Sequence, residues 1–277
     1  MANWSKISSR GNVEDRRSLG PVAIRGITLT SIALVFFMNY LNGGSVEGGL
    51  NEVLNNVLQQ QTQTEQNNED TSQFADNDPY EEFSSTVLGS NNEAWVNKFE
   101  DMGQYYEEPR LVLFRQATES TCGVATSQVG PHYCPADTTI YLDETFFDEL
   151  TSRFGAQGGD VAQAYVISHE VGHHVQNLLG DLGRLSGGDN ESSVAIELQA
   201  DCYAGVWAST LKDDGIFEPG EIREAMDAAA SVGDDRIQEK TQGYSNPETF
   251  THGSSEEREA WFTKGYDTGD AEICDTI

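Results

Sequence analysis

The sequence predicts an α+β fold in which a small β-sheet packs on a long helix and a helical C-terminal part follows, all behind an N-terminal transmembrane helix. Residues 110–114 and 139–143 are short runs of mostly apolar residues, which is typical of strands. Residues 160–179 carry apolar side chains at helical spacing between two start and stop signals, Gly158-Gly159-Asp160 and Gly180. Residues 26–41 contain no charged residue. These three observations define the predicted architecture.

The helix predicted over residues 160–179 contains the pattern His-Glu-x-x-His. His169 and His173 are four residues apart, so both imidazoles project from one face of a helix and can bind one metal ion. Zinc held by three protein ligands keeps a fourth position for water, whose pKa it lowers to about 7. Glu170 is placed to take a proton from that water. The alternative is a surface helix with a solvated His/Glu face, but the apolar residues around the pattern favour a mostly buried ligand helix.

A third ligand decides the class of zinc site. A metzincin would need Gly at position 176 and His at position 179, but the chain has Gln176 and Leu179. A second helical run, over residues 192–212, contains Glu197 and Asp201 on one face. Glu197 can complete a His, His, Glu ligand set, and Asp201 can accept the ring N–H of a ligand histidine. The alternative is a solvated acidic face, but carboxylates set among so many apolar residues usually have a partner.

Several segments resemble the bacterial "putative neutral zinc metallopeptidase" family. They are HEVGHHVQ (169–176), ELQADC (197–202), GDDRI (233–237), FTHGSS (250–255), YCPAD (133–137) and CDT (274–276). The resemblance extends from about residue 93 to the end of the chain. It implies a membrane-tethered, zincin-like hydrolase and supplies no substrate.

Together the residues and the resemblance predict a gluzincin-like zinc metallopeptidase with one Zn²⁺ per chain and a peptide or protein substrate. His169, His173 and Glu197 are the predicted ligands, Asp201 supports a ligand histidine, and Glu170 is the general base and then the acid. The rival hypothesis is a non-catalytic binding or chaperone-like envelope protein that keeps zinc for stability. The oligomeric state is not predicted.

Two further features bear on the predicted site. His252 could donate a hydrogen bond to the oxyanion of a tetrahedral intermediate, or it could be a helix-capping or core histidine. The strand predicted over residues 139–143 could be an edge strand that binds a substrate backbone by strand addition, and an ordinary core strand is an equal alternative.

The four cysteines are Cys122, Cys134, Cys202 and Cys274. An even count in an exported domain predicts two disulfides, for which three connectivities are possible. The local pair Cys122 with Cys134 is favoured, and this leaves Cys202 with Cys274. Zinc binding by cysteine is the competing interpretation, but no C-x-x-C spacing supports it.

The net charge of −30 argues against nucleic acid or an anionic membrane surface as a partner. Five basic residues lie at or before residue 25, and the next basic residue is Lys98. By the positive-inside rule, the N-terminus is therefore expected in the cytoplasm and the catalytic part outside the cell membrane, joined by a single-pass anchor. A cleaved signal peptide and a buried helix are the alternatives for the apolar stretch.

The predicted domain organisation follows from these assignments. Residues 1–20 form a cytoplasmic tail, residues 21–41 the transmembrane anchor, and residues 42–92 a disordered, acidic, Asn/Gln-rich linker. Residues 93–277 form the zinc metallopeptidase domain. Within it, a helix is expected near residues 93–102, a scaffold helix over residues 218–232 and a last helix over residues 256–264.

Overall fold

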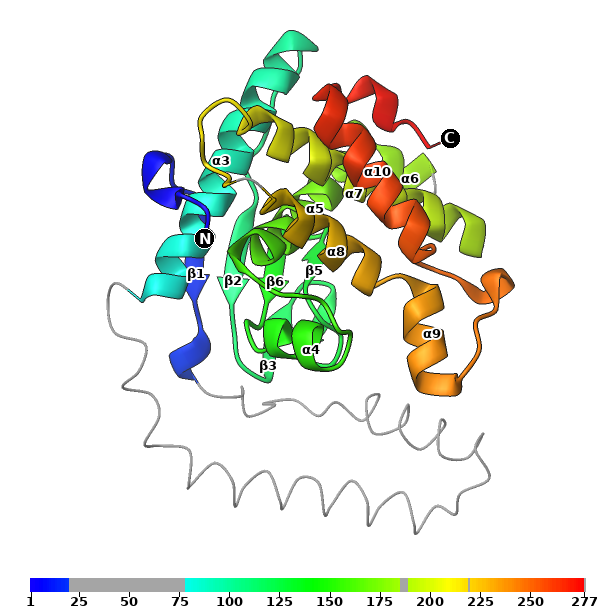
Figure 1. The fold of residues 1–277 in the computed structure, drawn as a ribbon. Helices are drawn as coiled ribbons and strands as arrows, with labels where there is room; N and C mark the ends of the chain where they lie inside the picture. The colour runs from blue at the N-terminus through cyan, green and yellow to red at the C-terminus, as the bar shows by residue number, and fades with distance from the viewer. Residues whose placement is uncertain (20–77, 185–188, 219, 277) are drawn as a thin grey trace. The chain divides into compact units, whose positions relative to one another are not determined.

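The computed structural model describes residues 1–19, 78–184, 189–218 and 220–276 (Figure 1). The chain divides into two compact units, one made of Met1–Arg16 with Asn77–Ile277 and the other of Arg17–Asp76. Only a short 3-10 helix, η2 (Arg17–Leu19), is described in the second unit. The first unit contains helices and two small sheets, which confirms the predicted α+β class.

In the first unit most of the described strands come before most of the described helices along the chain. In order they are η1 (Trp4–Lys6), β1 (Asn12–Asp15), α3 (Pro79–Asp101), β2 (Arg110–Leu113), β3 (Ala117–Ser120), β4 (Gly123–Thr126), β5 (His132–Cys134), β6 (Thr139–Leu142), α4 (Phe146–Ser152), α5 (Asp160–Leu179), α6 (Asp181–Arg184), α7 (Asn190–Thr210), α8 (Ile222–Ser231), α9 (Asp234–Gln242), η5 (Pro247–Thr249), α10 (Ser255–Thr268) and η6 (Glu272–Cys274).

The main sheet has the strand order β1-β2-β6-β5. Strands β1, β2 and β6 are parallel, whereas β5 runs antiparallel to β6 and forms one edge. Strands β3 and β4 form a separate hairpin. All four residues of β6 are buried, as expected for an inner strand. The strand predicted over residues 139–143 is therefore not at an edge, because β5 pairs with its outer side.

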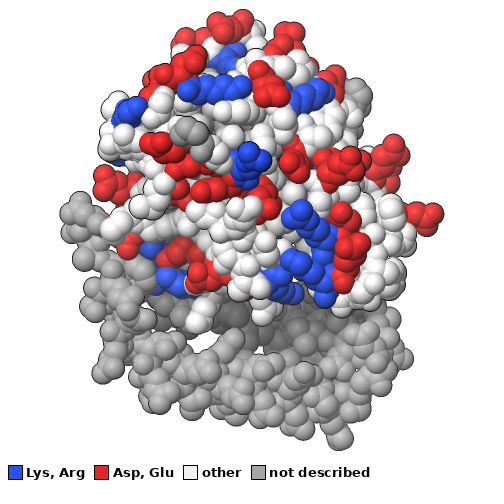
Figure 2. Space-filling view, viewed as in Figure 1, with Lys and Arg blue, Asp and Glu red and all other residues white. Residues whose placement is uncertain are grey.

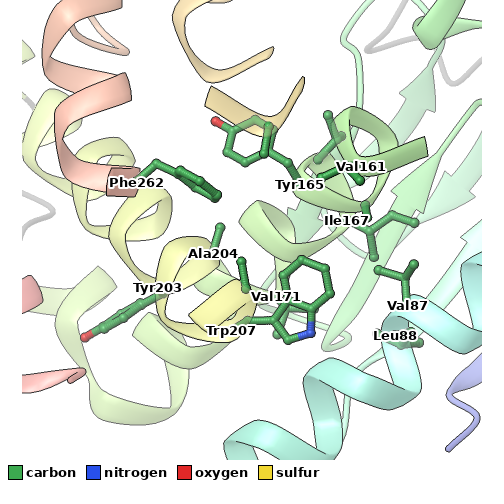
Figure 3. Packing of buried hydrophobic residues seen from close by; sticks show 14 of the residues in the cluster. Val87, Leu88, Val161, Tyr165, Ile167, Val171, Tyr203, Ala204, Trp207 and Phe262 are labelled. Carbon is green, nitrogen blue, oxygen red and sulfur yellow. The ribbon is translucent and has the colours of Figure 1, made fainter. Parts of the chain in front are cut away.

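Helix α5 lies at the centre of the unit and contacts β5, β6, α3, α7 and α8 (Figure 1). It ends where predicted, because Gly180 adopts a left-handed conformation with φ 83° and its N–H caps the last turn. Figure 3 shows the core around it, where Ile167 and Val171 of α5 lie near Trp207 of α7 and Val87 of α3. Burying side chains of this size stabilises the fold by roughly 1.5–3 kcal/mol each.

Two predicted boundaries of the folded domain are wrong. The linker was expected to extend to residue 92, but α3 begins at Pro79 and buries residues such as Val87 and Leu88. Asp78 caps this helix by accepting hydrogen bonds from the N–H groups of Tyr80 and Glu81, and Pro79 stands in its first turn. This start signal stands in a polar stretch of sequence, which masks the beginning of the folded domain.

The second boundary concerns the N-terminal tail. Residues 1–20 were expected to be separate from the enzyme, but β1 (Asn12–Asp15) is a strand of the main sheet. Residues 21–41 and 42–77, which hold the predicted anchor and most of the predicted linker, lie outside the described residues. Within the described ranges, no helix combines the length and apolarity needed to cross a bilayer.

Helices α5 and α7 approach closely at Gly172. A Cβ atom on this residue would lie 2.8 Å from the carbonyl oxygen of Ala200 and 3.0 Å from its Cα. Such contacts are shorter than van der Waals distances, so only glycine allows this separation of the two helices. Gly172 lies between Glu170 and His173 in the sequence. The distance between α5 and α7 at this point therefore also determines where the side chains of α7 lie relative to Glu170 and His173.

We predict that Gly172→Ala lowers the free energy of unfolding by about 1–3 kcal/mol, because the added methyl group forces the two helices apart. Thermal unfolding followed by circular dichroism would measure the loss. Gly183→Ala is the control, since a Cβ there meets no atom within 4 Å. Equal melting temperatures for the two variants would contradict the close approach.

Candidate metal centre

Three side chains from α5 and α7 converge on one point. His169 Nε2 lies 3.1 Å from Glu197 Oε2, and His173 Nε2 lies 3.6 Å from Glu197 Oε1. One ligand atom from each residue lies within 4.8 Å of those of the other two. Two ligands at about 2.0–2.1 Å from a tetrahedral zinc are separated by roughly 3.3 Å, so these distances fit a His, His, Glu zinc site.

The ring of His169 is held by Asp201. Its Nδ1 lies 2.8 Å from Asp201 Oδ1, and the same oxygen accepts a hydrogen bond of 2.5 Å from the hydroxyl of Tyr165. Because an ionised carboxylate only accepts, Nδ1 carries the hydrogen and Nε2 is the atom that can face a metal. This is the position in which the sequence expected Asp201.

Asp201 is itself paired with Arg258, a residue of α10. Arg258 Nε and Nη2 donate to the two carboxylate oxygens of Asp201 at 2.8 and 3.0 Å. Both side chains are buried, with exposed fractions of 4% and 0%. Arg258 Nη2 also lies 3.8 Å from Glu197 Oε2. A buried carboxylate needs such a partner to stay ionised, so Arg258 maintains the acceptor for His169.

The ring of His173 is held by Gln176. Its Nδ1 lies 2.9 Å from Gln176 Oε1. The amide nitrogen of Gln176 donates to the carbonyl of Ile196 and to Gln199 Oε1 on α7. Since that nitrogen is committed to α7, the amide oxygen must accept from His173, and Nε2 of His173 again faces the other ligands.

The acidic side chains of the site favour a positive charge at the position of His169. Burial lowers the pKa of His169, but Asp201 and Glu197 outweigh burial and raise it to about 10. Burial raises the pKa of Glu197, but His173 and His169 dominate and hold it below its ordinary value. A proton on His169 therefore sits where a metal would bind. Binding of zinc must displace that proton, so its affinity should fall as the pH is lowered.

Glu170 has no partner for one of its oxygens. The residue is buried, and its Oε2 makes no hydrogen bond with any described residue. Leaving a buried polar atom unpaired costs about 1–3 kcal/mol, so the position of this carboxylate calls for a reason other than stability. Glu170 lines the same cleft as His169, His173 and Glu197. Glu170 is therefore a neighbour of the candidate ligands in this cleft.

The cleft has a volume of about 540 Å³, which lies in the range of small-molecule and peptide-side-chain pockets. His132 and Tyr133, both in β5, lie along one wall. Strand β5 is the edge of the main sheet, and no described strand pairs with its outer side. The edge strand beside the site is therefore β5, and residues 139–143 form the core strand that the sequence offered as the equal alternative.

His252 also lines this cleft, although it is far from the other site residues in sequence. Its Nδ1 lies 3.3 Å from Asp234 Oδ1, and its backbone N–H donates to Asp234 Oδ2 at 2.6 Å. The side chain is half-exposed, and the hydrogen bond with Asp234 raises the pKa of His252. The structure therefore places His252 at the site and not in the core.

Both favoured disulfides are present. Cys122 is bonded to Cys134 and Cys202 to Cys274. The first links the β3–β4 turn to the edge strand β5, and the second links α7 to the C-terminal η6. No cysteine is free, which removes cysteine as a zinc ligand.

The sequence did not indicate three residues that act on the ligands. Arg258 and Tyr165 contact Asp201, and Gln176 contacts His173. A weak signal was available for Tyr165 and Gln176. Tyr165 lies four residues before His169 and Gln176 lies three after His173, so each shares a helix face with a ligand. Arg258 had no such signal, because it is distant from the ligands in sequence.

The His, His, Glu cluster, in which His169 is buried and the other two residues are half-buried, lies on two packed helices beside Glu170 and an edge strand, and it defines a candidate zinc hydrolase site. A family model described as "Putative neutral zinc metallopeptidase" matches residues 2–277. The chain belongs to this family.

The chain has relatives in Escherichia coli and in Mycobacterium tuberculosis. It is 45% identical over 203 residues to "Uncharacterized protein YpfJ" of Escherichia coli, an alignment that covers 70% of each chain. It is 52% identical over 185 residues to "Uncharacterized protein Rv2575" of Mycobacterium tuberculosis, covering 62% of this chain and 63% of that one. No solved structure matches the chain.

We predict that Glu197→Ala purifies largely free of zinc, because it leaves only two imidazoles at the site. Loss of a residue that merely supports a ligand typically weakens binding about 10–100-fold, and loss of a ligand should cost more. Metal analysis of the purified protein would measure the zinc content. Glu191→Ala, an exposed residue of the same helix, is the control. Full zinc occupancy in Glu197→Ala would refute the ligand assignment.

We predict that Arg258→Met weakens zinc binding about 10–100-fold, because Asp201 loses its counter-charge and no longer orients His169. Arg258→Lys should recover part of the affinity, since it keeps the charge but not the paired hydrogen bonds. Chelator competition would give the dissociation constants. Arg223→Met, which removes an exposed arginine of α8, should change nothing. A folded Arg258→Met protein with wild-type affinity would contradict the role.

Proposed function

We propose that this protein is a zinc metallopeptidase that hydrolyses peptide bonds with Glu170 as its general base. The observation that carries the proposal is that Glu170, whose Oε2 has no hydrogen-bond partner among the described residues, lines the same cleft as the His169, His173 and Glu197 cluster. A zinc ion bound there would polarise a substrate carbonyl and lower the pKa of a water molecule to about 7. A carboxylate with a free oxygen is suited to accept that proton.

Glu170 has the right position along the helix. Each residue of an α-helix is rotated about 100° from the one before it, so Glu170 lies beside the face that carries His169 and His173. It can therefore take a proton from the attacking water without being a ligand. Later it can return the proton to the leaving amine, which makes it the general base and then the general acid.

The edge strand β5 gives a physical reason to favour peptides as substrates. An extended peptide can add to an exposed sheet edge through main-chain hydrogen bonds, which places its backbone along the cleft. His132 and Tyr133 of this strand line the cleft that holds Glu170. The antiparallel edge strand next to the ligand helix also supports a zincin-like, gluzincin-like fold.

His252 is proposed to stabilise the oxyanion of the tetrahedral intermediate. Asp234 holds its Nδ1 and raises its pKa, which favours the imidazolium form. In that form both ring nitrogens are donors, so Nε2–H is available to an oxyanion in the cleft. Asp234 also fixes the loop through the N–H groups of Thr251 and His252.

We place the catalytic unit outside the cytoplasm. Both disulfides are formed, and such bonds persist in oxidising compartments. The chain carries a net charge of −30, and Figure 2 shows acidic side chains spread over the visible face with basic ones among them. Nucleic acid is therefore not a proposed partner.

Several residues that line the cleft are apolar. Val166 lies one helical turn before Glu170 on α5, and Phe146, Leu150 and Phe154 line the cleft from α4 and the segment after it. Phe146 and Phe154 are half-buried, so parts of both rings are open to a ligand. Such a surface suits a bulky apolar side chain next to the scissile bond.

We predict that Glu170→Gln keeps its zinc and its thermal stability but loses peptide hydrolysis by roughly 10²–10⁴-fold, because the base is removed while the size is kept. A peptide library with zinc supplied would measure the activity. Glu191→Gln is the matched control on an exposed surface. If wild type and Glu170→Gln behave alike on every peptide, the protein is a zinc-stabilised binding protein and the peptidase proposal fails.

We predict that Phe154→Ala lowers kcat/KM for peptides with Leu beside the scissile bond by about 10-fold, and has a smaller effect on peptides with Ala there. The variant loses apolar area that only a large side chain would use. Tyr244→Ala, which removes a ring 62% exposed and outside the cleft lining, is the control. An equal loss for Leu and Ala peptides would argue against an apolar subsite.

A further inference from the structure

We propose that residues 1–16 and the catalytic unit lie on the same side of the membrane. The basic tail and the positive-inside rule predicted the opposite, with the N-terminus in the cytoplasm and the enzyme outside. A single crossing by residues 21–41 would separate β1 from β2, so it is incompatible with the folded unit. This inference does not depend on whether the protein is a peptidase.

Backbone hydrogen bonds make the N-terminal segment part of the sheet. Strand β1 pairs in parallel with β2 over four residues, from Asn12 opposite Arg110 to Asp15 opposite Leu113. The ladder continues beyond the strand, since the N–H of Arg16 donates to the carbonyl of Leu113 at 2.8 Å. Strand pairing of this kind cannot form across a bilayer, because both backbones must lie in one plane about 4.8 Å apart.

Close packing against α3 leaves no room for another arrangement. A Cβ on Gly89 would lie 2.5 Å from the backbone nitrogen of Arg10, and one on Gly11 would lie 2.5 Å from Leu88. The N–H of Gly11 also donates to the carbonyl of Ser85, and the Ser85 hydroxyl donates back to Gly11. Two glycines on facing segments thus allow a backbone contact that is specific to this docking.

The segment also contacts the helix that carries the metal ligands. The backbone N–H of Ala2 and the indole N–H of Trp4 both donate to Oδ2 of Asp160, at 2.9 and 2.8 Å. Asp160 is the first residue of α5, whose preceding residue Gly159 provides no side-chain cap. The ring of Trp4 packs edge-on against Phe83 and Phe217. Removing this segment would therefore expose the rings of Phe83 and Phe217 and would leave Oδ2 of Asp160 without its two hydrogen-bond donors.

Three of the five basic residues that suggested a cytoplasmic tail have partners within the unit. Lys6 Nζ donates to the carbonyls of Asp214 and Gly215 at 2.9 and 2.8 Å. Arg16 forms paired hydrogen bonds with Glu14 at 2.7 and 3.0 Å, and the guanidinium of Arg10 donates to the carbonyl of Ile7. Because these basic side chains stabilise the folded unit, their presence near the N-terminus is weaker evidence for a cytoplasmic location.

The two disulfides indicate on which side of the membrane the unit lies. Because the two disulfides favour an oxidising compartment, we place residues 1–16 there with the rest of the unit.

Cysteine labelling of the full chain in spheroplasts tests the inference. Ser8→Cys and Tyr244→Cys each introduce one exposed thiol, the first in the N-terminal segment and the second in the catalytic unit. A membrane-impermeant maleimide should label both to the same extent without permeabilisation. Labelling of Tyr244→Cys alone, with Ser8→Cys labelled only after permeabilisation, would overturn the inference. Protection of both would support the shared side but would refute the external location of the enzyme.

A second measurement does not depend on accessibility. Val13 and Leu111 are register partners, so the double variant Val13→Cys with Leu111→Cys should form a cross-link in the membrane-bound protein. Val13→Cys with Leu142→Cys is the control, because Leu142 lies one strand further away on β6. Peptide mapping without reductant would detect the bond. An uncross-linked Val13 and Leu111 pair, in protein whose native disulfides are formed, would contradict the docking of β1.

Discussion

The candidate site depends on the close approach of α5 and α7 at Gly172. With no side chain at this position, the backbone of Ala200 lies directly against α5. Glu197 and Asp201 are one helical turn apart on α7, so the same contact brings both to His169. A rigid pair of helices can hold ligands to within a few tenths of an ångström, which a metal site requires.

Burying this many charges requires that each has a counterpart. Asp201 is fully buried and is paired with Arg258, while Glu197 lies between the two histidines. Each charge is costly alone in the interior, and the set is stable because its members neutralise one another. Glu170 is the exception, since one of its oxygens has no partner among the described residues. An unsatisfied group in an otherwise satisfied network is where chemistry is expected.

The N-terminal segment, residues 1–16, also supports the site from outside the hydrophobic core. It completes the sheet as β1 and contacts Asp160 at the start of α5, so it supports the sheet and the ligand helix together. A segment with so many specific contacts is part of the folded unit rather than a tail. The first residues of the chain are therefore linked by direct contacts to the helix that carries His169 and His173.

The sequence by itself determined the features that rest on local geometry. His169, Glu170 and His173 share neighbouring faces of one helix because of its 3.6-residue period, and the same holds for Glu197 and Asp201. The short separation of Cys122 and Cys134 also favoured the pair that formed. Only the tertiary structure decided the partnership of Arg258 with Asp201, the edge position of β5, and the docking of β1 beside β2. These are contacts between residues far apart in the chain, and no local periodicity encodes which distant segments come together. The early start of α3 is an intermediate case, because Asp78 and Pro79 mark it locally but only burial in the core shows that it is folded.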